Sequence, residues 1–282
     1  MVQQAQDGTV KFLLGLSDGR AVETVLVPFN HQDCVCVSTQ VGCAMACTFC
    51  HTGQQGLTRP LTAAEIVQEY TEVWQWLQEN RPGRPRPKVV YMGQGEPMHN
   101  FDAVKESIQI LTDQRGIALG IRSVTVSTAG YVPGVERFME LGGVNFALSL
   151  HSPFNQERSQ LIPINNRWPL ESVFTAIDRL QLRKRQFINC EYLVVKDFNH
   201  SEQHALALKE LLQNRTAIVN LIPFNPYPGS PWQRPEMSEV EKFKAHLVAQ
   251  GIRTFIRTTK GDEIMAACGQ LNTAPETLGA FA

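Results

Sequence analysis

The sequence has no excess of charge of either sign. Its 282 residues include 26 Lys and Arg and 27 Asp and Glu, so the formal net charge is −1. This balance excludes a general basic field that would attract nucleic acid, and any RNA binding has to come from a local patch. Long apolar runs are missing too. No stretch of about 18 apolar residues occurs that could span a membrane, and the first seven residues contain no apolar core of a signal peptide.

Cysteine is scarce, and its number is odd. Seven cysteines cannot all pair, and three of them share one short segment, which argues against a framework of disulfides. Unpaired thiols are typical of a reducing compartment, so we expect a cytoplasmic protein without a membrane partner. Nothing in the sequence indicates an oligomeric state. The hydrophobic content of 43% is enough for one large α/β core.

The apolar pattern predicts strands that alternate with helices. Residues 10–14 and 21–27 read as a hairpin, and we assign residues 1–30 to an N-terminal β extension of a core domain at 31–282. Seven strands are expected at 34–39, 88–92, 121–127, 144–150, 188–195, 217–222 and 252–256. Helices are expected between them at 62–80, 102–112, 135–141, 170–182, 201–212 and 238–249, the first and last opened by capping boxes at Thr62–Glu65 and Ser238–Glu241. Six strand–helix units and a last strand predict a parallel α/β sheet, too short for a closed eight-stranded barrel.

Three cysteines lie together in the segment that follows the first of these parallel strands. Cys43, Cys47 and Cys50 are separated by three and two residues, a spacing that suits three thiolates on one inorganic centre. A [4Fe–4S] cluster usually takes four cysteine ligands, so three would leave one iron open to a ligand that is not protein. The alternative is zinc, with Cys34 and Cys36 completing a four-thiolate set. However, zinc sites usually pair ligands from two separate turns.

Polar residues follow several other predicted strands. Ligands of parallel α/β sheets gather at the carboxyl ends of the strands, and the unusual residues of this chain fall there. Two glycines precede Glu96 after the second strand, which allows close approach to a ligand and a carboxylate for a cationic amine. The further candidates at strand ends are Gly95, Ser127, Ser149, Leu150, His151 and Asn225. Each alone is common in turns, and only their shared position favours a site.

Several motifs in order identify a family. The segments are Val22–Val25, Cys36–Cys43, Gly95–Pro97, Ser149–His151, Asn220–Pro226 and Ala266–Leu271. Through them the chain resembles the RlmN/Cfr family of radical S-adenosylmethionine RNA methyltransferases, and RlmN more than Cfr. The resemblance implies a partial (βα)6 radical SAM barrel with an N-terminal β-hairpin extension. It also implies two cofactors, a [4Fe–4S] cluster on Cys43, Cys47 and Cys50 and S-adenosyl-L-methionine.

The resemblance further implies a reaction and a role for each matching residue. The expected reaction methylates carbon 2 of adenine in rRNA or tRNA, with Cys268 as methyl carrier, Cys36 as the thiol that releases the product and Glu23 as proton acceptor. A disulfide between Cys36 and Cys268 would remain after release. Electrons would come from a small donor protein such as flavodoxin. The residues implied to bind S-adenosylmethionine are Gly95, Glu96, Ser127, Ser149, Leu150, His151 and Asn225.

Two features leave the substrate open. Family members carry an N-terminal accessory domain, whereas only about 20 residues precede Glu23 here. Basic residues occur in two groups, Arg81, Arg84, Arg86 and Lys88, and Arg179, Arg183, Lys184 and Arg185, which fit a solvated surface as well as RNA contact. The alternatives are the same chemistry on another nucleic acid and a non-catalytic metal-binding relative. Cys34 shares a face with Cys36 if the strand is regular, and Cys190 reads as a packing residue.

Overall fold

The computed structural model describes residues 1–183 and 186–273. One ten-stranded sheet runs through them in the order β1-β2-β3-β4-β7-β8-β9-β10-β11-β12. Its strands are β1 (Val2–Gln4), β2 (Val10–Gly15), β3 (Ala21–Val27), β4 (Cys34–Val37), β7 (Lys88–Tyr91), β8 (Val124–Thr128), β9 (Asn145–Ser149), β10 (Ile188–Val194), β11 (Ala217–Pro223) and β12 (Thr254–Ile256). The helices are α1 (His51–Gln54), α2 (Ala63–Asn80), α3 (Phe101–Thr112), α4 (Val132–Glu136), α5 (Asn155–Leu161), α6 (Leu170–Asp178), α7 (Glu202–Leu212) and α8 (Met237–Ala249).

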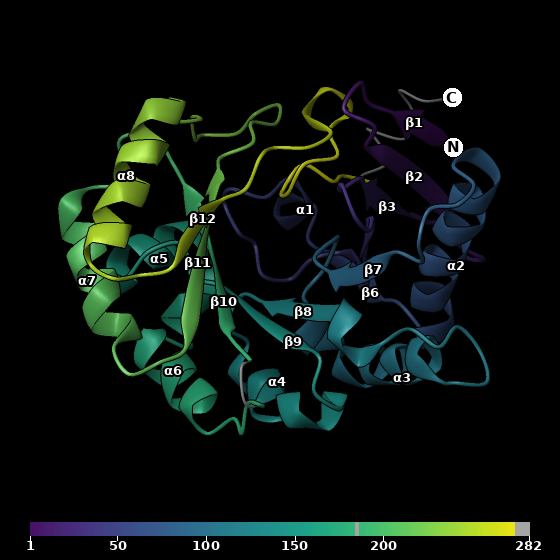
Figure 1. Ribbon diagram of the computed structural model, residues 1–282, viewed down its shortest axis with the longest axis horizontal. Coiled ribbons are helices and arrows are strands. Elements are labelled where there is room, and N and C mark those ends of the chain that lie inside the picture. Colours follow the sequence, from purple (N-terminus) through teal and green to yellow (C-terminus); the bar gives the residue numbers. More distant parts are fainter. Residues whose placement is uncertain (184–185, 274–282) are drawn as a thin grey trace.

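From β4 onward all neighbouring strands of this sheet pair in parallel. A helix follows every one of them except β12, so the predicted six strand–helix units and a last strand are confirmed. The larger helices lie around the outside of the curved sheet, and α1 lies near its centre (Figure 1). In the described part of the chain, the two end strands, β1 and β12, do not pair with each other, so the sheet is open. No helix among these residues is long and apolar enough to cross a membrane.

The predicted N-terminal hairpin is present. β2 and β3 pair antiparallel, and β3 pairs with β4, so the hairpin continues the parallel sheet at one edge. The division of the chain at residue 30 stays a prediction. β1 was not predicted, nor was a separate two-stranded sheet of β5 (Gln40–Gly42) and β6 (Leu57–Pro60) on either side of the cysteine segment. The β5–β6 sheet fixes both ends of that segment.

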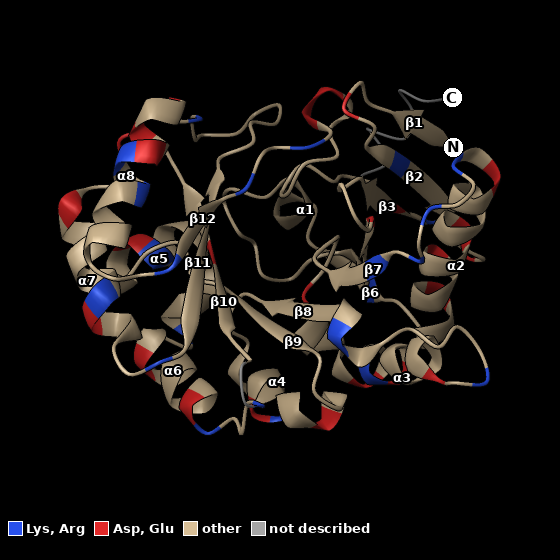
Figure 2. Cartoon of the chain, viewed as in Figure 1, with Lys and Arg blue, Asp and Glu red and all other residues tan. Residues whose placement is uncertain are grey.

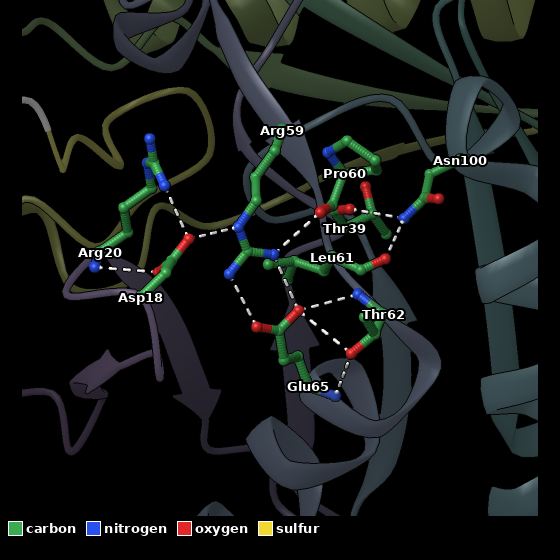
Figure 3. A network of polar contacts seen from close by, with 9 residues as sticks. All are labelled: Asp18, Arg20, Thr39, Arg59, Pro60, Leu61, Thr62, Glu65 and Asn100. Atoms are coloured by element: carbon green, nitrogen blue, oxygen red, sulfur yellow. Dashed lines mark hydrogen bonds and ion pairs between the residues drawn. The ribbon is translucent and has the colours of Figure 1, made fainter.

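A polar network connects the hairpin with this small sheet and with α2 (Figure 3). The Arg59 guanidinium on β6 donates to Asp18 in the hairpin turn at 2.7 Å and to both carboxylate oxygens of Glu65 at 2.8 and 2.9 Å. Glu65 also accepts from the backbone N–H of Thr62, which confirms the capping box at the start of α2. Asn100 donates to the carbonyls of Thr39 and Leu61, both at 2.8 Å.

Other predicted boundaries were wrong. The predicted helix at 135–141 is divided into α4 and a 3-10 turn at Phe138–Leu141, and the helix expected at 170–182 ends at Asp178. α8 begins at Met237 rather than within the predicted Ser238–Glu241 box. The reason is that the carboxylate of Glu239 accepts the backbone N–H of Glu236 at 2.8 Å, so that Glu236, two residues before Ser238, caps the helix.

The alternation on β4 was predicted correctly. Val35 and Val37 are fully buried against the helices, whereas Cys34 and Cys36 lie on the opposite, inner face of the sheet and are half-buried. Cys190 on β10 is fully buried, as expected of a packing residue. These assignments separate the packing cysteine from the two that face the concave side of the sheet.

Glu69 is a buried carboxylate on α2 with only part of its hydrogen bonding satisfied. Its Oε2 accepts from the Ser38 N–H at 2.9 Å and from the Thr24 hydroxyl, while no partner of its buried Oε1 is found among the described residues. Burial raises the pKa of Glu69 to about 8. The unfolded chain ionises this group near its ordinary pKa of about 4.5, so folding becomes less favourable as the pH rises from there toward 8.

We expect Glu69→Gln to stabilise the protein at neutral pH. The amide oxygen can take both hydrogen bonds of Oε2, and the variant has no carboxylate to keep protonated. The gain in unfolding free energy should be about 1–3 kcal/mol at pH 7 and should shrink toward pH 5. Urea unfolding at the two pH values measures it. Glu72→Gln, at an exposed position of the same helix, is the control. A variant–wild-type difference that is the same at both pH values would contradict the assignment.

Candidate active site at the mouth of the open sheet

The three clustered cysteines lie in a loop that leads from β5 into α1. Cys43 and Cys47 are buried and Cys50 is half-buried. The loop is fixed at both ends, since Cys43 donates to the Gly56 carbonyl at 2.9 Å and Thr48 to the Leu161 carbonyl at 3.0 Å. Gly42, at φ +75°, has to be glycine, because a Cβ there would lie 1.9 Å from the Gly56 oxygen.

The donor set of this loop fits an iron–sulfur cluster. Burial raises the pKa of all three thiols, and the neighbouring Cys50 and Cys43 thiols raise that of Cys47 further, so the three groups are neighbours. In the described ranges, no three His, Cys, Asp or Glu side chains are arranged to hold a metal ion. The three thiols come from one loop of eight residues, and cysteine thiolates are the usual ligands of a [4Fe–4S] cluster. The other two thiols of the zinc alternative, Cys34 and Cys36, are influenced by Cys268 and not by this loop.

The loop after β7 places Glu96 at the ends of two strands. Its buried carboxylate accepts from the backbone N–H of Met98 at 3.1 Å and of Ala129 at 2.8 Å, and burial raises its pKa to about 7. Gly95 lies at φ +98°, with Gln40 against it so closely that a Cβ would approach the Gln40 side chain to 2.6 Å. Both oxygens of Glu96 therefore bind backbone, and its predicted contact with a cationic amine stays a prediction.

The other predicted ligand residues lie on the same edge of the sheet. Ser127 lies near the end of β8, and Ser149 is the last residue of β9. His151 is buried, its Nδ1 accepts the Leu193 N–H at 3.0 Å, and burial lowers its pKa to about 3, so the ring is neutral. Leu150, between these two, is fully buried.

The C-terminal segment brings Cys268 to this edge. Asn225, after β11, donates through Nδ2 to the Cys268 carbonyl at 3.1 Å. The Cys268 side chain is exposed, yet the surrounding protein desolvates it enough to raise its pKa, an effect that Arg257 opposes. The pKa of Cys36 is raised well above its ordinary value, first by burial and then by the Cys268 thiol. The fold therefore brings together two cysteines from opposite ends of the chain, both as free thiols.

Glu23 lies on the same face of the sheet, on β3. Its carboxylate pairs with Lys11 at 2.8 Å and accepts the Asn272 N–H at 2.8 Å. Burial raises the pKa of Glu23, and Lys11 opposes this. Val25, next on this face, packs with Ala266 and Cys36, so Glu23 and Cys36 share the wall that the C-terminal segment covers.

Sequence analysis missed three charged residues in this region. Arg158 on α5 is fully buried and donates to the carbonyls of Ala129, Ser149 and Leu150. Glu191 on β10 is buried and pairs with Arg257 at 2.7 Å. The sequence did offer a signal for Glu191, because an acidic residue stands between Cys190 and Tyr192 in an apolar strand. Arg158 gave no local signal, because its partners lie on other elements.

The predicted basic groups are largely occupied within the chain. Arg84 pairs with Asp33, Arg81 donates to the Gly8 carbonyl at 2.8 Å, and Arg183 to the Gly142 carbonyl at 2.6 Å. Lys184 and Arg185 lie outside the described residues. Figure 2 shows Lys and Arg interspersed with Asp and Glu around the outer helices rather than gathered on one face.

Comparisons with known proteins agree with this geometry. The Radical SAM superfamily profile matches residues 37–208. The dual-specificity RNA methyltransferase RlmN of Desulfotalea psychrophila is 42% identical over 283 residues, 98% of this chain and 78% of the relative. That of Magnetococcus marinus is 41% identical, covering 96% and 76%. The crystal structure of a radical SAM methyltransferase from Sphaerobacter thermophilus matches with a TM-score of 0.93 at 39% identity, covering 97% of this chain and 80% of that one.

The chain belongs to the radical SAM superfamily, and its fold and cysteine loop are those of that class. Within the superfamily it belongs to the RlmN family. Superfamily membership gives it two cofactors, a [4Fe–4S] cluster and S-adenosylmethionine. The expected partial-barrel fold is thereby confirmed, as an open sheet.

Proposed function

We propose that this protein methylates carbon 2 of adenine in RNA, rRNA or tRNA, through a methylated Cys268. The observation that carries the proposal is the nearness of the Cys268 segment to Cys36: Ala266 packs in one cluster with Cys36, and the Cys268 thiol raises the pKa of Cys36. A protein that only binds a cluster has no use for two further thiols there. The names of its relatives, dual-specificity RNA methyltransferases, support RNA as the substrate.

The chemistry explains why two thiols and a cluster belong together. Carbon 2 of adenine is not nucleophilic, so polar methyl transfer to it fails. When bound, the cluster and S-adenosylmethionine supply an electron and a radical able to remove hydrogen from a methyl group. Cys43, Cys47 and Cys50 would hold the cluster. Gly95, Glu96, Ser127, Ser149, Leu150, His151 and Asn225 would hold S-adenosylmethionine at the strand ends.

Each remaining residue has a defined task in this proposal. Cys268, on an exposed segment, carries the carbon between the methyl donor and the base. Cys36, after losing its thiol proton, attacks the Cys268 sulfur; the sulfur–carbon bond breaks with its electron pair going to carbon, which takes up a proton and becomes the methyl group, and a Cys36–Cys268 disulfide forms. Glu23 takes the proton lost from carbon 2, and Lys11 beside it stabilises the carboxylate before that step. A small electron-donor protein such as flavodoxin is expected to supply electrons.

The experiment that tests the function uses the reconstituted enzyme without oxygen. Transcribed rRNA and tRNA are incubated with S-adenosylmethionine and a reductant, digested to nucleosides and analysed by mass spectrometry. We expect 2-methyladenosine in at least one RNA. A methyl group on any other atom, or its complete absence with a fully loaded cluster, would contradict the proposal.

We predict that the cysteine loop holds one [4Fe–4S] cluster through three cysteines. Reconstituted protein should contain about four irons and four sulfides per chain. Replacing Cys43, Cys47 and Cys50 together by Ala should abolish iron binding, whereas Cys34→Ala should retain it, because Cys34 lies on β4 near Cys268. One zinc per chain, or loss of iron in Cys34→Ala, would show that the ligand assignment is wrong.

A further inference from the structure

Cys268 lies at the tip of a tight turn at residues 267–270. The backbone N–H of Gln270 donates to the Ala267 carbonyl at 3.0 Å, and the Gln270 Oε1 accepts the Ala267 N–H at 3.0 Å. Gly269, the third residue, has φ +85°, the left-handed conformation that this position of a type II turn requires. The Cys268 side chain is exposed, whereas Gln270 is buried. The turn therefore presents a thiol on a base that its own last residue closes.

Backbone hydrogen bonds tie this turn to both sides of the site. The Gly269 carbonyl accepts the His51 N–H at 2.6 Å, and His51 directly follows Cys50 of the cysteine loop. On the other side Asn225, after β11, donates to the Cys268 carbonyl at 3.1 Å. The turn is thus held between the cysteine loop and the carboxyl end of β11.

Asp262 joins the side chains that hold the β11 side of the turn. Its Oδ2 accepts from Arg234 Nη2 at 2.8 Å, and its Oδ1 accepts from Gln270 Nε2 at 2.7 Å. The same Arg234 nitrogen donates to Asn225 Oδ1 at 3.1 Å, and the same Gln270 nitrogen donates to the Pro226 carbonyl at 2.7 Å. With the Asn225 contact to the turn, these bonds close a ring. A half-exposed Arg–Asp pair contributes little by itself, but here each partner also holds a separate segment of chain.

The ring leaves each polar group only one arrangement. Asn225 Oδ1 accepts from both Arg234 and Thr259, the latter at 3.0 Å, so the amide NH₂ of Asn225 has to face the turn. Asp262 meets two donors, Arg234 and Gln270, and only a group with two acceptor oxygens satisfies both. The carboxylate at 262 is therefore the part of the ring that no amide can replace.

We propose that Asp262, Arg234 and Gln270 are positioning residues for the methyl carrier, an inference that rests on the proposed role of Cys268. They hold the backbone of the turn, so that the thiol meets the bound methyl donor in the orientation that transfer requires. In that transfer the Cys268 sulfur loses its proton to water and bonds the methyl carbon. The bond from this carbon to the donor's sulfonium breaks, with its electron pair going to the donor's sulfur. Reactions between bound groups depend steeply on such orientation.

Asp262→Asn tests the ring without changing its size. The new amide has to turn its NH₂ toward Arg234 or Gln270, which sets a donor against a donor. Gln270 cannot reverse its own amide, because its Oε1 already accepts the Ala267 N–H. The rate of Cys268 methylation in the holoenzyme at saturating S-adenosylmethionine should fall about 10- to 100-fold, measured by mass spectrometry of the Cys268 peptide. The rate at which iodoacetamide alkylates the same thiol should stay at the wild-type value, because this reagent needs no fixed orientation.

A double variant and a control separate positioning from damage to the fold. Asp262→Asn/Gln270→Glu exchanges donor and acceptor, so the new amide donates to the new carboxylate and its oxygen accepts from Arg234. We expect this pair to recover a large part of the methylation rate that Asp262→Asn loses. Asp178→Asn, which removes the exposed partner of Arg215 at the end of α6, should methylate Cys268 as fast as wild type.

The outcomes distinguish this inference from the proposed function. Wild-type rates of Cys268 methylation in Asp262→Asn, an equal loss of methylation and alkylation, or no recovery in the double variant would overturn the inference even if 2-methyladenosine forms. Slow methylation with unchanged alkylation and recovery in the double variant would support it, even if no RNA tested acquires 2-methyladenosine. A wild-type protein that never carries a methyl group on Cys268 would overturn both.

Discussion

RNA is expected to accumulate on Cys268 in the Cys36→Ala variant. Without Cys36, no thiol at this position attacks the Cys268 sulfur, so the bond between that sulfur and the RNA carbon stays intact. The Cys268→Ala variant should fail earlier, because it has no sulfur to accept the methyl group. Both should lose methylated RNA completely, yet only the first should contain a covalent protein–RNA adduct.

The two failures are distinguished on a denaturing gel with labelled RNA, followed by nuclease digestion and peptide mass spectrometry. The adducted peptide should contain Cys268. The double variant Cys36→Ala/Cys268→Ala should give no adduct. Cys190→Ala is the matched control, since Cys190 is fully buried on β10 away from these thiols and its loss should leave turnover intact. Full turnover by Cys36→Ala or by Cys268→Ala would mean that the chain does not use a carrier and a resolving thiol.

The disulfide expected after release requires Cys36 and Cys268 to approach each other. Two cysteines bridge when their Cα atoms come within about 7 Å. Cys36 is fixed on a central strand, paired on both sides. Cys268 lies in a segment of small residues, held at its backbone by Asn225. Any closing movement therefore belongs to the Cys268 segment, and the exposure of its side chain agrees with a thiol that visits two partners.

The sequence could predict those parts of the site that depend on local pattern. The cysteine loop, the capping box at Thr62 and the alternation of strands and helices follow from spacing and periodicity within short windows. Cys36 and Cys268 could be named only through resemblance, because some 230 residues separate them and only the folded chain brings them together. β1 and β6 were missed because each short segment contains only one large aliphatic residue and therefore shows no apolar alternation.

The charged residues inside the molecule were the least predictable part. A buried Glu191 or Arg158 cannot be told from a surface residue by its neighbours in sequence, because its partners come from other strands and helices. Glu191 meets Asn220 across β11 and Arg257 after β12.

Arg158→Met is expected to lower the unfolding free energy by about 3–5 kcal/mol. The guanidinium is fully buried, and no acidic partner of it is found in the part of the chain that the structure describes. Instead it donates to the Leu150 carbonyl at 3.0 Å, the Ala129 carbonyl at 2.7 Å, the Ser149 carbonyl at 2.9 Å and the Asn165 Oδ1 at 2.7 Å. Burial lowers its pKa to about 10, so it remains charged at neutral pH. Methionine fills the space but leaves these acceptors buried and unpaired.

Arg158→Lys separates the charge of the side chain from its shape. An ammonium keeps the charge, but a single point of donation cannot reach four acceptors on two strand ends and a loop, so we expect a loss between those of wild type and Arg158→Met. Arg179→Met, at an exposed ion pair after α6, should change stability by less than about 0.5 kcal/mol. Urea unfolding measures the three variants, and the slope of the unfolding free energy against urea concentration should be the same in all of them. Because Arg158 joins the ends of β8 and β9, where Ser127 and Ser149 lie, Arg158→Met should also bind S-adenosylmethionine more weakly at temperatures where it is still folded. If Arg158→Met were as stable as wild type, the four hydrogen bonds of Arg158 would not hold these strand ends together.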